Sequence, residues 1–341
     1  MRKIAIACAI TLSALSAGML ATTQAAQAWP SFASSYEKAR DSSGKIVCAN
    51  CHLGVQPVEV EVPTSVMPNE VFEVKLHIPY DSKVQQVISD GSKGPMQIGA
   101  YVQLPEGFTL AEEKDLTEEQ KKVLETQPVS PLYADKPERS NILISGPYPG
   151  DAVKDQEIII PVKAPDPNAK DATVNFGKYS IYAGGNRGRG QVYTNGAASN
   201  NAQYIASAAG TITKIEQDIK YTTQLQFGGD SSPLDQEYEK ATRVTIQGDA
   251  GKSAVVNIPP GPQLLADIKE GVKVKAGQPL TNDPNVGGYA QEERDIVLQD
   301  PQRVTWLLVF LAAAFVCQLL LVLKKKQVEK VQELEAQQQG L

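Results

Sequence analysis

Histidine and cysteine are scarce in this chain of 341 residues, which has two histidines and four cysteines. One cysteine lies in the N-terminal segment and another in a long apolar stretch near the opposite end. The rest of the chain holds Cys48, Cys51, His52 and His77. A structural zinc site would need a second pair of ligands, and outside the string 48–52 only His77 is available. The chain also has no Lys/Arg-rich run interleaved with aromatic residues, which argues against a nucleic-acid-binding protein.

The N-terminus predicts export. Residues 1–28 begin with basic Arg2 and Lys3, continue with an apolar core and close on Ala26-Gln27-Ala28. This order is typical of a secretory signal peptide. A membrane anchor is the alternative, but polar residues interrupt the apolar core too often for it to span. We therefore expect cleavage before Trp29 and removal of the first 28 residues.

The C-terminus predicts one membrane anchor. Residues 304–323 have only two polar interruptions, and twenty helical residues at about 1.5 Å each reach across a bilayer core of about 30 Å. Lys324, Lys325 and Lys326 follow at once and predict that the tail, residues 324–341, lies on the cytoplasmic or stromal side. The exported part, residues 29–302, has 26 Lys and Arg against 36 Asp and Glu, a formal charge of −10.

The string Cys48-Ala49-Asn50-Cys51-His52 predicts covalent attachment of a c-type haem. The two thiols of this spacing can add to the two vinyl groups of one porphyrin, and the adjacent histidine can then ligate the iron axially. A disulfide with a two-residue gap would be redox-active rather than structural. A thioredoxin-like site would require a βαβ setting, which the pattern does not show.

The second axial ligand is open at this point. His77 falls on the polar face of an alternating strand and is expected to be exposed. Met67 and Met96, each beside a proline, are the remaining conventional candidates, since Met/His ligation occurs in c-type cytochromes.

The remaining pattern predicts a mainly β protein. Residues 58–62 and 72–78 alternate apolar with polar, and 158–162 read as a buried strand. Frequent Pro and Gly between short runs favour a large antiparallel β-sandwich. We expect one amphipathic surface helix over residues 117–126, and a helix or two over residues 36–53 that present the haem motif.

We expect five segments after the signal peptide: a large haem domain (29–201), a small domain (202–285), a return to the large domain (286–303), the membrane helix and the tail. Residues 271–280 resemble a lipoyl or biotinyl carrier domain without a modified lysine, so the small domain is expected to be β-rich. Residues 224–252 look like a local insertion. The glycine-dense stretch 184–190 is not followed by the G-K-[ST] of a phosphate-binding loop, so we expect a turn packed against the haem.

From Trp29 to the tail the chain resembles cytochrome f, the haem subunit of the photosynthetic cytochrome bf complex. The matching strings are spread over the whole mature chain. They are Lys45–Leu53, Ile78–Asp81, Leu104–Phe108, Phe176–Ser180, Gly184–Gln191, Asn282–Gly288, Ile296–Asp300 and Leu321–Lys326.

The resemblance implies that the free α-amino group of the mature N-terminus is the sixth ligand. That residue is Trp29 here, where the family usually has tyrosine, and the ligating atom is a backbone nitrogen. Pro30 and Phe32 match family positions beside the haem. A chain of buried waters leading from the haem is implied at four further positions, which are Gln86, Asn186, Gln191 and Asn201.

The resemblance also implies a function that is not enzymatic. Single electrons would pass from a Rieske iron–sulfur protein to plastocyanin or a small soluble c-type cytochrome, in a thylakoid membrane complex with the haem domain in the lumen. A haem enzyme or sensor with an exchangeable sixth ligand is the alternative, and a structural subunit with an incidental haem is a third. Where plant relatives carry docking lysines, this chain has Gln85, with Lys93 and Lys83 nearby, so we expect weak attraction of an acidic partner.

Overall fold

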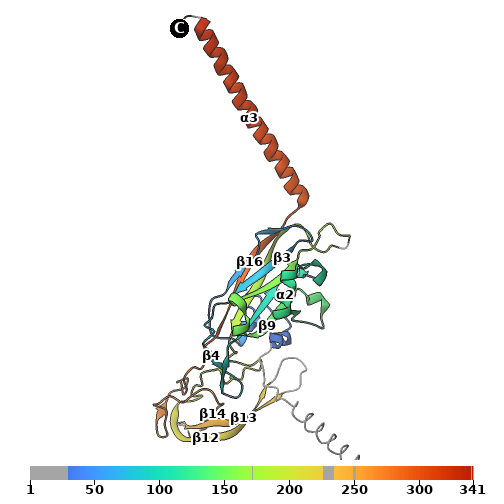
Figure 1. Cartoon of the computed structure of the whole chain (residues 1–341). Helices are drawn as coiled ribbons and strands as arrows, with labels where there is room; N and C mark the ends of the chain where they lie inside the picture. The colour runs from blue at the N-terminus through green and yellow to red at the C-terminus, as the bar shows by residue number, and fades with distance from the viewer. Residues whose placement is uncertain (1–29, 171, 226–233, 249–250, 339, 341) are drawn as a thin grey trace, which may run out of the picture.

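The computed structural model describes residues 30–170, 172–225, 234–248, 251–338 and 340. Figure 1 shows an elongated β body, a smaller sheet at one end of it, and a long helix, α3, that projects from the other end. The predicted signal peptide and Trp29 lie outside the described residues.

The large body contains two facing sheets. The four-stranded sheet has the order β1-β3-β10-β7, with β1 (Glu59–Glu61), β3 (Val71–His77), β7 (Thr109–Leu110) and β10 (Glu157–Lys163). The six-stranded sheet has the order β2-β16-β11-β6-β9-β8, with β2 (Ser65–Val66), β6 (Gln97–Gln103), β8 (Val129–Pro131), β9 (Ile142–Pro149), β11 (Gly177–Arg187) and β16 (Gly288–Leu298). All pairs are antiparallel except β16 with β2.

The two sheets bury a shared apolar core, as expected for a β-sandwich. Along β3 the side chains alternate between half-buried and fully buried, which confirms the expected period of two. The core takes side chains from both sheets, among them Val74, Leu76, Ile98, Ile160, Ile181 and Ile296.

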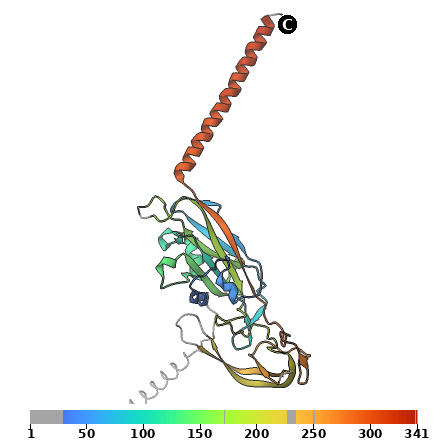
Figure 2. The same ribbon diagram turned by 180° about the vertical axis from the view of Figure 1, so that it is seen from behind.

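A second apolar cluster covers the opposite face of the six-stranded sheet. It joins Ile46 and Val47 of the N-terminal segment to Tyr101 of β6 and Tyr289 of β16. Figure 2 shows this segment, in blue, at the end of the large body that faces the small sheet. The chain around Cys48 is therefore fixed on a rigid sheet.

The helical expectation for residues 36–53 is wrong for most of that segment. The structure has only two short 3₁₀ turns near the motif, η1 (Pro30–Ser35) and η2 (Val47–Asn50). Between them, the Asp41 carboxylate accepts hydrogen bonds from the backbone N–H groups of Ser43 and Lys45. Such side-chain-to-backbone bonds compete with a helix and favour a turn.

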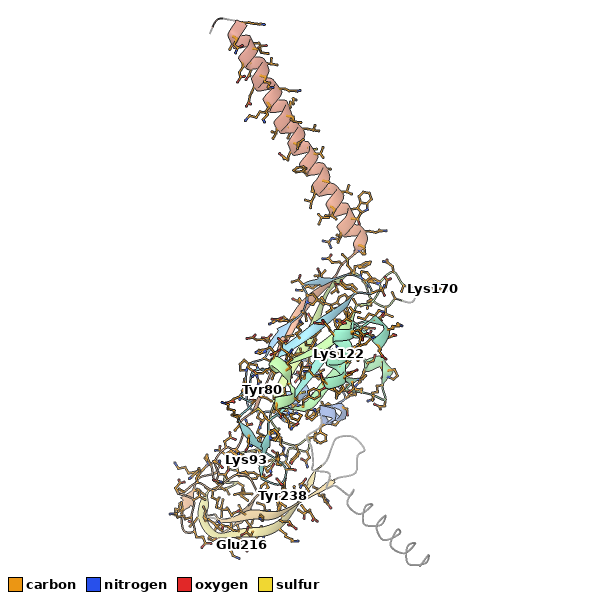
Figure 3. The ribbon with its side chains drawn as sticks, viewed as in Figure 1. Tyr80, Lys93, Lys122, Lys170, Glu216 and Tyr238 are labelled. Carbon is orange, nitrogen blue, oxygen red and sulfur yellow. The ribbon has the colours of Figure 1, made fainter. Side chains whose placement is uncertain are left out.

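The expected surface helix is confirmed as α2 (Glu118–Thr126). Further 3₁₀ turns are η3 (Glu113–Asp115), η4 (Pro137–Arg139), η5 (Gly150–Ala152) and η6 (Lys154–Gln156). A separate hairpin of β4 (Gln85–Val87) and β5 (Lys93–Pro95) extends toward the small sheet, with Lys93 at its end (Figure 3).

The small sheet has the order β14-β13-β12-β15, with β12 (Gly210–Leu225), β13 (Leu234–Gln247), β14 (Ser253–Ile258) and β15 (Lys273–Val274). It has its own apolar cluster, which includes Ile212, Val244, Ile246, Val256 and Leu280. The β-rich character of this region is confirmed, while its likeness to a lipoyl carrier and the boundaries at 202 and 285 stay predictions.

Helix α3 (Pro301–Gln338) contains the predicted membrane span and continues through most of the tail. It is long and apolar enough to cross a membrane, and none of its most apolar window is buried against the rest of the chain. A lipid bilayer would provide the missing apolar surroundings.

Candidate haem site

A single turn gathers the three residues of the haem motif. Cys48 lies in η2, and its carbonyl accepts hydrogen bonds from the N–H groups of Cys51, at 3.2 Å, and His52, at 3.0 Å. Both cysteines are free thiols. The tight turn directs the side chains of Cys48, Cys51 and His52 to one cavity.

This cavity has a volume of about 340 Å³, within the range of roughly 300–1,000 Å³ typical of ligand pockets. Its apolar lining comes from η1, through Phe32 and Ala33, and from the six-stranded sheet, through Tyr101 and Tyr289. Residues 188–190 and 192–194 form another part of the wall. A large planar apolar cofactor fits such a lining.

The protonation of the motif suits metal ligation and not thiol redox chemistry. Burial lowers the pKa of His52 to about 4, against the opposing effect of the neighbouring Asn186, so the imidazole is neutral as a metal ligand must be. Burial raises the pKa of Cys48 to about 12, and burial also raises the pKa of Cys51. Because the reactive form of cysteine is the thiolate, raised thiol pKa values disfavour thioredoxin-like chemistry.

The conventional candidates for a sixth ligand do not line the cavity. His77 ends β3 opposite Glu59 and Glu157. Met96 is buried in the sandwich core, and Met67 is 39% exposed on a turn. Within the described ranges, no group of three or more His, Cys, Asp or Glu is placed to hold a metal ion.

The residues expected beside the haem come from the N-terminus. Phe32 is half-buried and lines the cavity. Pro30 begins η1, but its side chain, like the whole of Trp29, lies outside the described residues. The first described turn of the chain, η1, therefore forms part of the cavity wall.

The four amides expected to hold water divide into two pairs. Gln86 and Asn186 line the cavity itself. Gln191 and Asn201 lie behind its wall, where both side-chain NH₂ groups donate to the Arg189 carbonyl, at 2.9 and 2.7 Å. The Gln191 oxygen also accepts from the N–H of Leu53, at 2.7 Å. The structure thus ties this pair to the haem motif.

Three of these amides have an unused acceptor. Gln86 Oε1, Asn186 Oδ1 and Asn201 Oδ1 are buried without a hydrogen-bond partner among the described residues. Buried polar atoms normally have a partner in the protein or an ordered water. Their arrangement suits bound water between the cavity and the interior.

Sequence reasoning missed two members of this region. Asn285 contacts Asn201 through a 3.3 Å hydrogen bond between the two amides, and it lies in a string that already marked the resemblance. The Tyr289 hydroxyl is buried at the cavity without a described partner. The strand pattern of β16 shows that Tyr289 is buried, but not which cavity it meets.

The glycine-dense stretch, residues 184–190, is only partly the expected turn, because residues 184–187 belong to strand β11. Gly184, Gly188 and Gly190 line the cavity. A Cβ on Gly190 would lie 3.1 Å from the Cys51 carbonyl oxygen, and one on Gly184 would lie 2.7 Å from the Tyr289 ring. Only glycine permits both close approaches without displacing neighbours.

These features fit a covalently held haem: two free thiols and a neutral imidazole on an apolar cavity, with unused acceptors at its polar end. Two family models match the chain, "Apocytochrome F, N-terminal" over residues 29–188 and "Apocytochrome F, C-terminal" over residues 200–338.

Similar proteins agree over the whole chain. It is 65% identical to cytochrome f of Gloeobacter violaceus over the full length of both proteins. It is 46% identical to cytochrome f of Synechococcus elongatus, over 94% of this chain and 95% of that protein. Cytochrome f of Mastigocladus laminosus is also 46% identical, over 93% and 89%. The chain therefore belongs to the cytochrome f family, the membrane-anchored c-type cytochromes that carry covalently bound haem as electron-transport subunits of the photosynthetic cytochrome b6f complex.

Proposed function

We propose that this chain passes single electrons from a Rieske iron–sulfur protein to plastocyanin or a small soluble c-type cytochrome. The observation that carries the proposal is the convergence of Cys48, Cys51 and His52 on one cavity that offers no second histidine or methionine. A haem with both axial positions filled supplies one-electron chemistry and has no open position for a substrate.

Each residue of the motif has a separate task. Cys48 and Cys51 would hold the haem through thioether links, and His52 would ligate its iron. The α-amino group of Trp29 would be the second ligand, once the peptide bond to Ala28 is cut. A peptide nitrogen is planar and delocalised and therefore a poor ligand, so processing creates the donor. Pro30 and Phe32 pack beside the haem and keep water from this side.

In this proposal, four side-chain amides at the cavity and behind its wall hold a chain of waters. Gln86 and Asn186 take part at the cavity, and Gln191 and Asn201 continue it inward. Their unused acceptors support the assignment, because ordered buried waters need several polar partners.

The same proposal fixes the orientation in the membrane. The haem and small domains, bounded at 29–201 with 286–303 and at 202–285, lie in the lumen. Residues 304–323 span the bilayer, and residues 324–341 lie on the cytoplasmic or stromal side. Lys324, Lys325 and Lys326 directly after the apolar span support this orientation.

Two sets of variants test the site. Cys48→Ala and Cys51→Ala each leave one thioether, and together they abolish haem that stays attached after denaturation, as measured by haem staining of denaturing gels. A variant blocked at the Ala28–Trp29 cut should keep attached haem but lose the native six-coordinate spectrum. An unchanged spectrum in the uncut protein would refute the amine ligand. Carbon monoxide binding by the reduced native protein would favour a haem enzyme or sensor instead.

A further inference from the structure

The strands β12 and β13 are much longer than the core of the small domain requires. They pair from Thr211 with Gln247 out to Leu225 with Leu234. The small-domain core takes its side chains from the inner part of this ribbon, such as Ile212 and Val244. Residues 219–225 and 234–241 are here called the outer ribbon, and none of their described side chains, those of residues 219–224 and 235–241, belongs to that core. Contacts outside the small-domain core must therefore stabilise the outer ribbon.

A break in register separates the outer ribbon from the inner part. The pairing shifts between Glu216 and Ile219 and again before Tyr221, and Asp218 has a φ of 52°. Extra residues of this kind bend a strand and increase its twist. Figures 1 and 2 show the ribbon curving back toward the large body.

The bent outer ribbon contacts the turn 193–198 of the large body. The Asn195 side chain donates a 2.8 Å hydrogen bond to the Gln224 carbonyl of β12. From the first residues of the small domain, the Tyr204 hydroxyl donates to the carbonyls of Ala198 and Ser199, at 3.2 and 3.3 Å. The turn is thus held from the small-domain side at two separate residues, Gln224 and Tyr204.

A tyrosine pair forms the centre of this contact. Tyr238 is only 4% exposed, although its neighbours Glu237 and Glu239 on the same strand are exposed (Figure 3). Its ring stacks on Tyr221 of β12, with centroids 6.2 Å apart and planes 10° apart. Tyr221 lies three residues from Gln224, whose carbonyl accepts the bond from Asn195, so the stacked rings lie beside the point where the ribbon meets the turn. Burial, with the Tyr193 hydroxyl as a further cause, raises the pKa of Tyr238.

The turn held in this way is also a wall of the haem cavity. Val192, Tyr193 and Thr194 line the cavity. On their other side, the N–H groups of Gln191 and Val192 both donate to the Cys51 carbonyl, at 2.8 and 3.3 Å. One short segment therefore connects the outer ribbon to the haem motif.

We propose that the outer ribbon is part of the haem site and that Tyr238, backed by Tyr221, is a positioning residue for Tyr193. It holds the 193–198 turn as a closed wall and so limits access of water to the haem. The inference rests on the proposed haem attachment in this cavity. Because reduction potentials of haem depend on solvent exposure and on nearby hydrogen bonds, a loosened wall lowers the potential.

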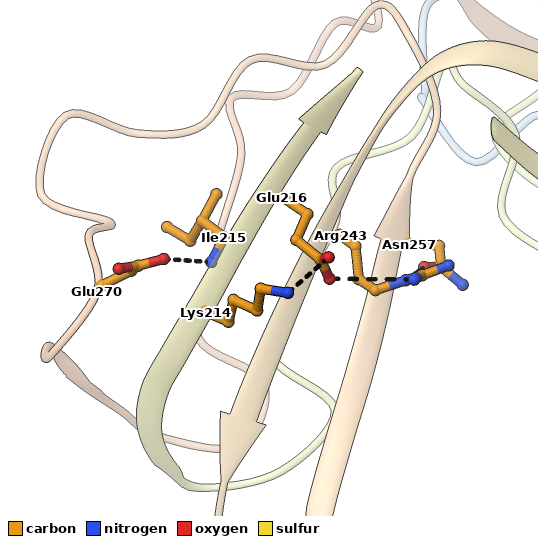
Figure 4. A network of polar contacts seen from close by, with 6 residues as sticks. All are labelled: Lys214, Ile215, Glu216, Arg243, Asn257 and Glu270. Carbon is orange, nitrogen blue, oxygen red and sulfur yellow. Dashed lines mark hydrogen bonds and ion pairs between the residues drawn. The ribbon is translucent and has the colours of Figure 1, made fainter. Parts of the chain in front are cut away.

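The test compares variants at the two ends of the ribbon in the full-length, detergent-solubilised protein with its haem. Tyr238→Ala removes the ring at the wall, and Tyr238→Phe removes only the hydroxyl. The matched control is Arg243→Ala in the inner part, where Arg243 Nε donates to Asn257 Oδ1 at 3.1 Å and a guanidinium NH₂ group lies 4.0 Å from Glu216 (Figure 4). This control weakens the same sheet but does not touch the turn.

Two measurements distinguish positioning from general stability. Hydrogen exchange of the Tyr193 and Gly196 amides, both bonded within the turn, should be at least about tenfold faster in Tyr238→Ala, the ratio expected when an opening equilibrium shifts by one factor of ten. The reduction potential of Tyr238→Ala should fall, that of Tyr238→Phe should fall less, and Arg243→Ala should change neither quantity at the turn.

The outcomes that overturn the proposal are separate from those that overturn the haem assignment. Equal effects of Tyr238→Ala and Arg243→Ala, or an unchanged potential in Tyr238→Ala with haem attached, refute the positioning role. If Tyr238→Ala does not fold, Asn195→Ala removes the bond to Gln224 without disturbing the rings. Unchanged turn exchange and potential in Asn195→Ala would then refute the role. Wild-type protein without attached haem would instead refute the proposed function.

Discussion

Arg187 is a fully buried guanidinium that has backbone carbonyls as its partners. It donates to the carbonyls of Pro79, Gln56, Gly288 and Pro57 at the end of β11. Burial lowers the pKa of Arg187 to about 10, so it remains charged at neutral pH. A buried acceptor that loses its donor costs about 1–3 kcal/mol. We therefore expect Arg187→Met to lower the free energy of unfolding by about 3 kcal/mol or more.

Arg294 of β16 provides the control for Arg187. It also donates to a backbone carbonyl, that of Val60, but its side chain is 42% exposed beside Glu292. Water can replace the partners of Arg294, so Arg294→Met should lower the free energy of unfolding by no more than about 1 kcal/mol. Urea unfolding of the two variants, followed by tyrosine and tryptophan fluorescence, makes the comparison. Similar decreases in the free energy of unfolding would mean that burial does not determine how much these hydrogen bonds stabilise the fold.

Among the secondary-structure elements, helix α2 is stabilised at its N-terminus by a capping box. The Thr117 hydroxyl accepts from the Gln120 N–H, and the Gln120 side chain accepts from the Thr117 N–H. Loss of such a cap costs about 1 kcal/mol. Thr117→Ala should therefore speed hydrogen exchange within residues 118–126 by about fivefold, the equivalent of 1 kcal/mol.

Thr126 at the other end of α2 is a matched substitution. Its hydroxyl donates to the Lys122 and Val123 carbonyls of its own helix. Such back-bonding adds little to a helix. Thr126→Ala should leave exchange at the N-terminal turn of α2 near the wild-type rate. Equal acceleration by both substitutions would contradict the role of the cap.

A helix or strand could be predicted from the sequence where the residues that determine it are close together in the chain. The alternation in β3 and the surface helix α2 each depend on residues only a few positions apart, and both predictions are confirmed. The prediction of a helix over residues 36–53 is wrong for most of that segment, because the Asp41 carboxylate binds the backbone N–H groups of Ser43 and Lys45 and favours a turn. At the site, the motif identifies Cys48 and His52 by itself. The hydrogen bond from Asn195 of the turn to Gln224 of β12 joins segments 29 residues apart across a bend, which no local period encodes.

At the scale of the whole molecule, α3 is separable from the exported part. Apart from the half-buried Val304, its described residues are exposed, and its most apolar window has no burial against the sheets. A chain that ends at Gln302 should therefore be exported and soluble, with the same haem spectrum and the same unfolding midpoint as the anchored protein. Membrane fractionation and visible spectroscopy measure this. A truncated protein that aggregates or loses haem would show that the helix also supports the fold.

Under the proposed function, surface charge would decide which carrier residues 29–302 attract. Their formal charge is −10, and the two lysines nearest the β4–β5 hairpin, Lys83 and Lys93, are exposed but few. Arg189 does not add to them, because it is buried and bonded to the Val87 carbonyl and the Asn200 side chain. Charges on separate proteins are screened beyond about 10 Å at 0.1 M salt. Attraction of a basic carrier should therefore weaken as salt is added, while repulsion of an acidic one is relieved.

Stopped-flow reduction of two carriers tests this at increasing ionic strength. The rate with a basic plastocyanin or cytochrome should fall, by on the order of tenfold if steering is strong. The rate with an acidic plastocyanin should stay level or rise, because added salt removes net repulsion. Lys83→Gln with Lys93→Gln should change the acidic-carrier rate by less than about twofold, since two exposed lysines give little steering against an acidic surface. A steep fall of that rate with salt in wild type, abolished by the two substitutions, would instead assign docking to these lysines.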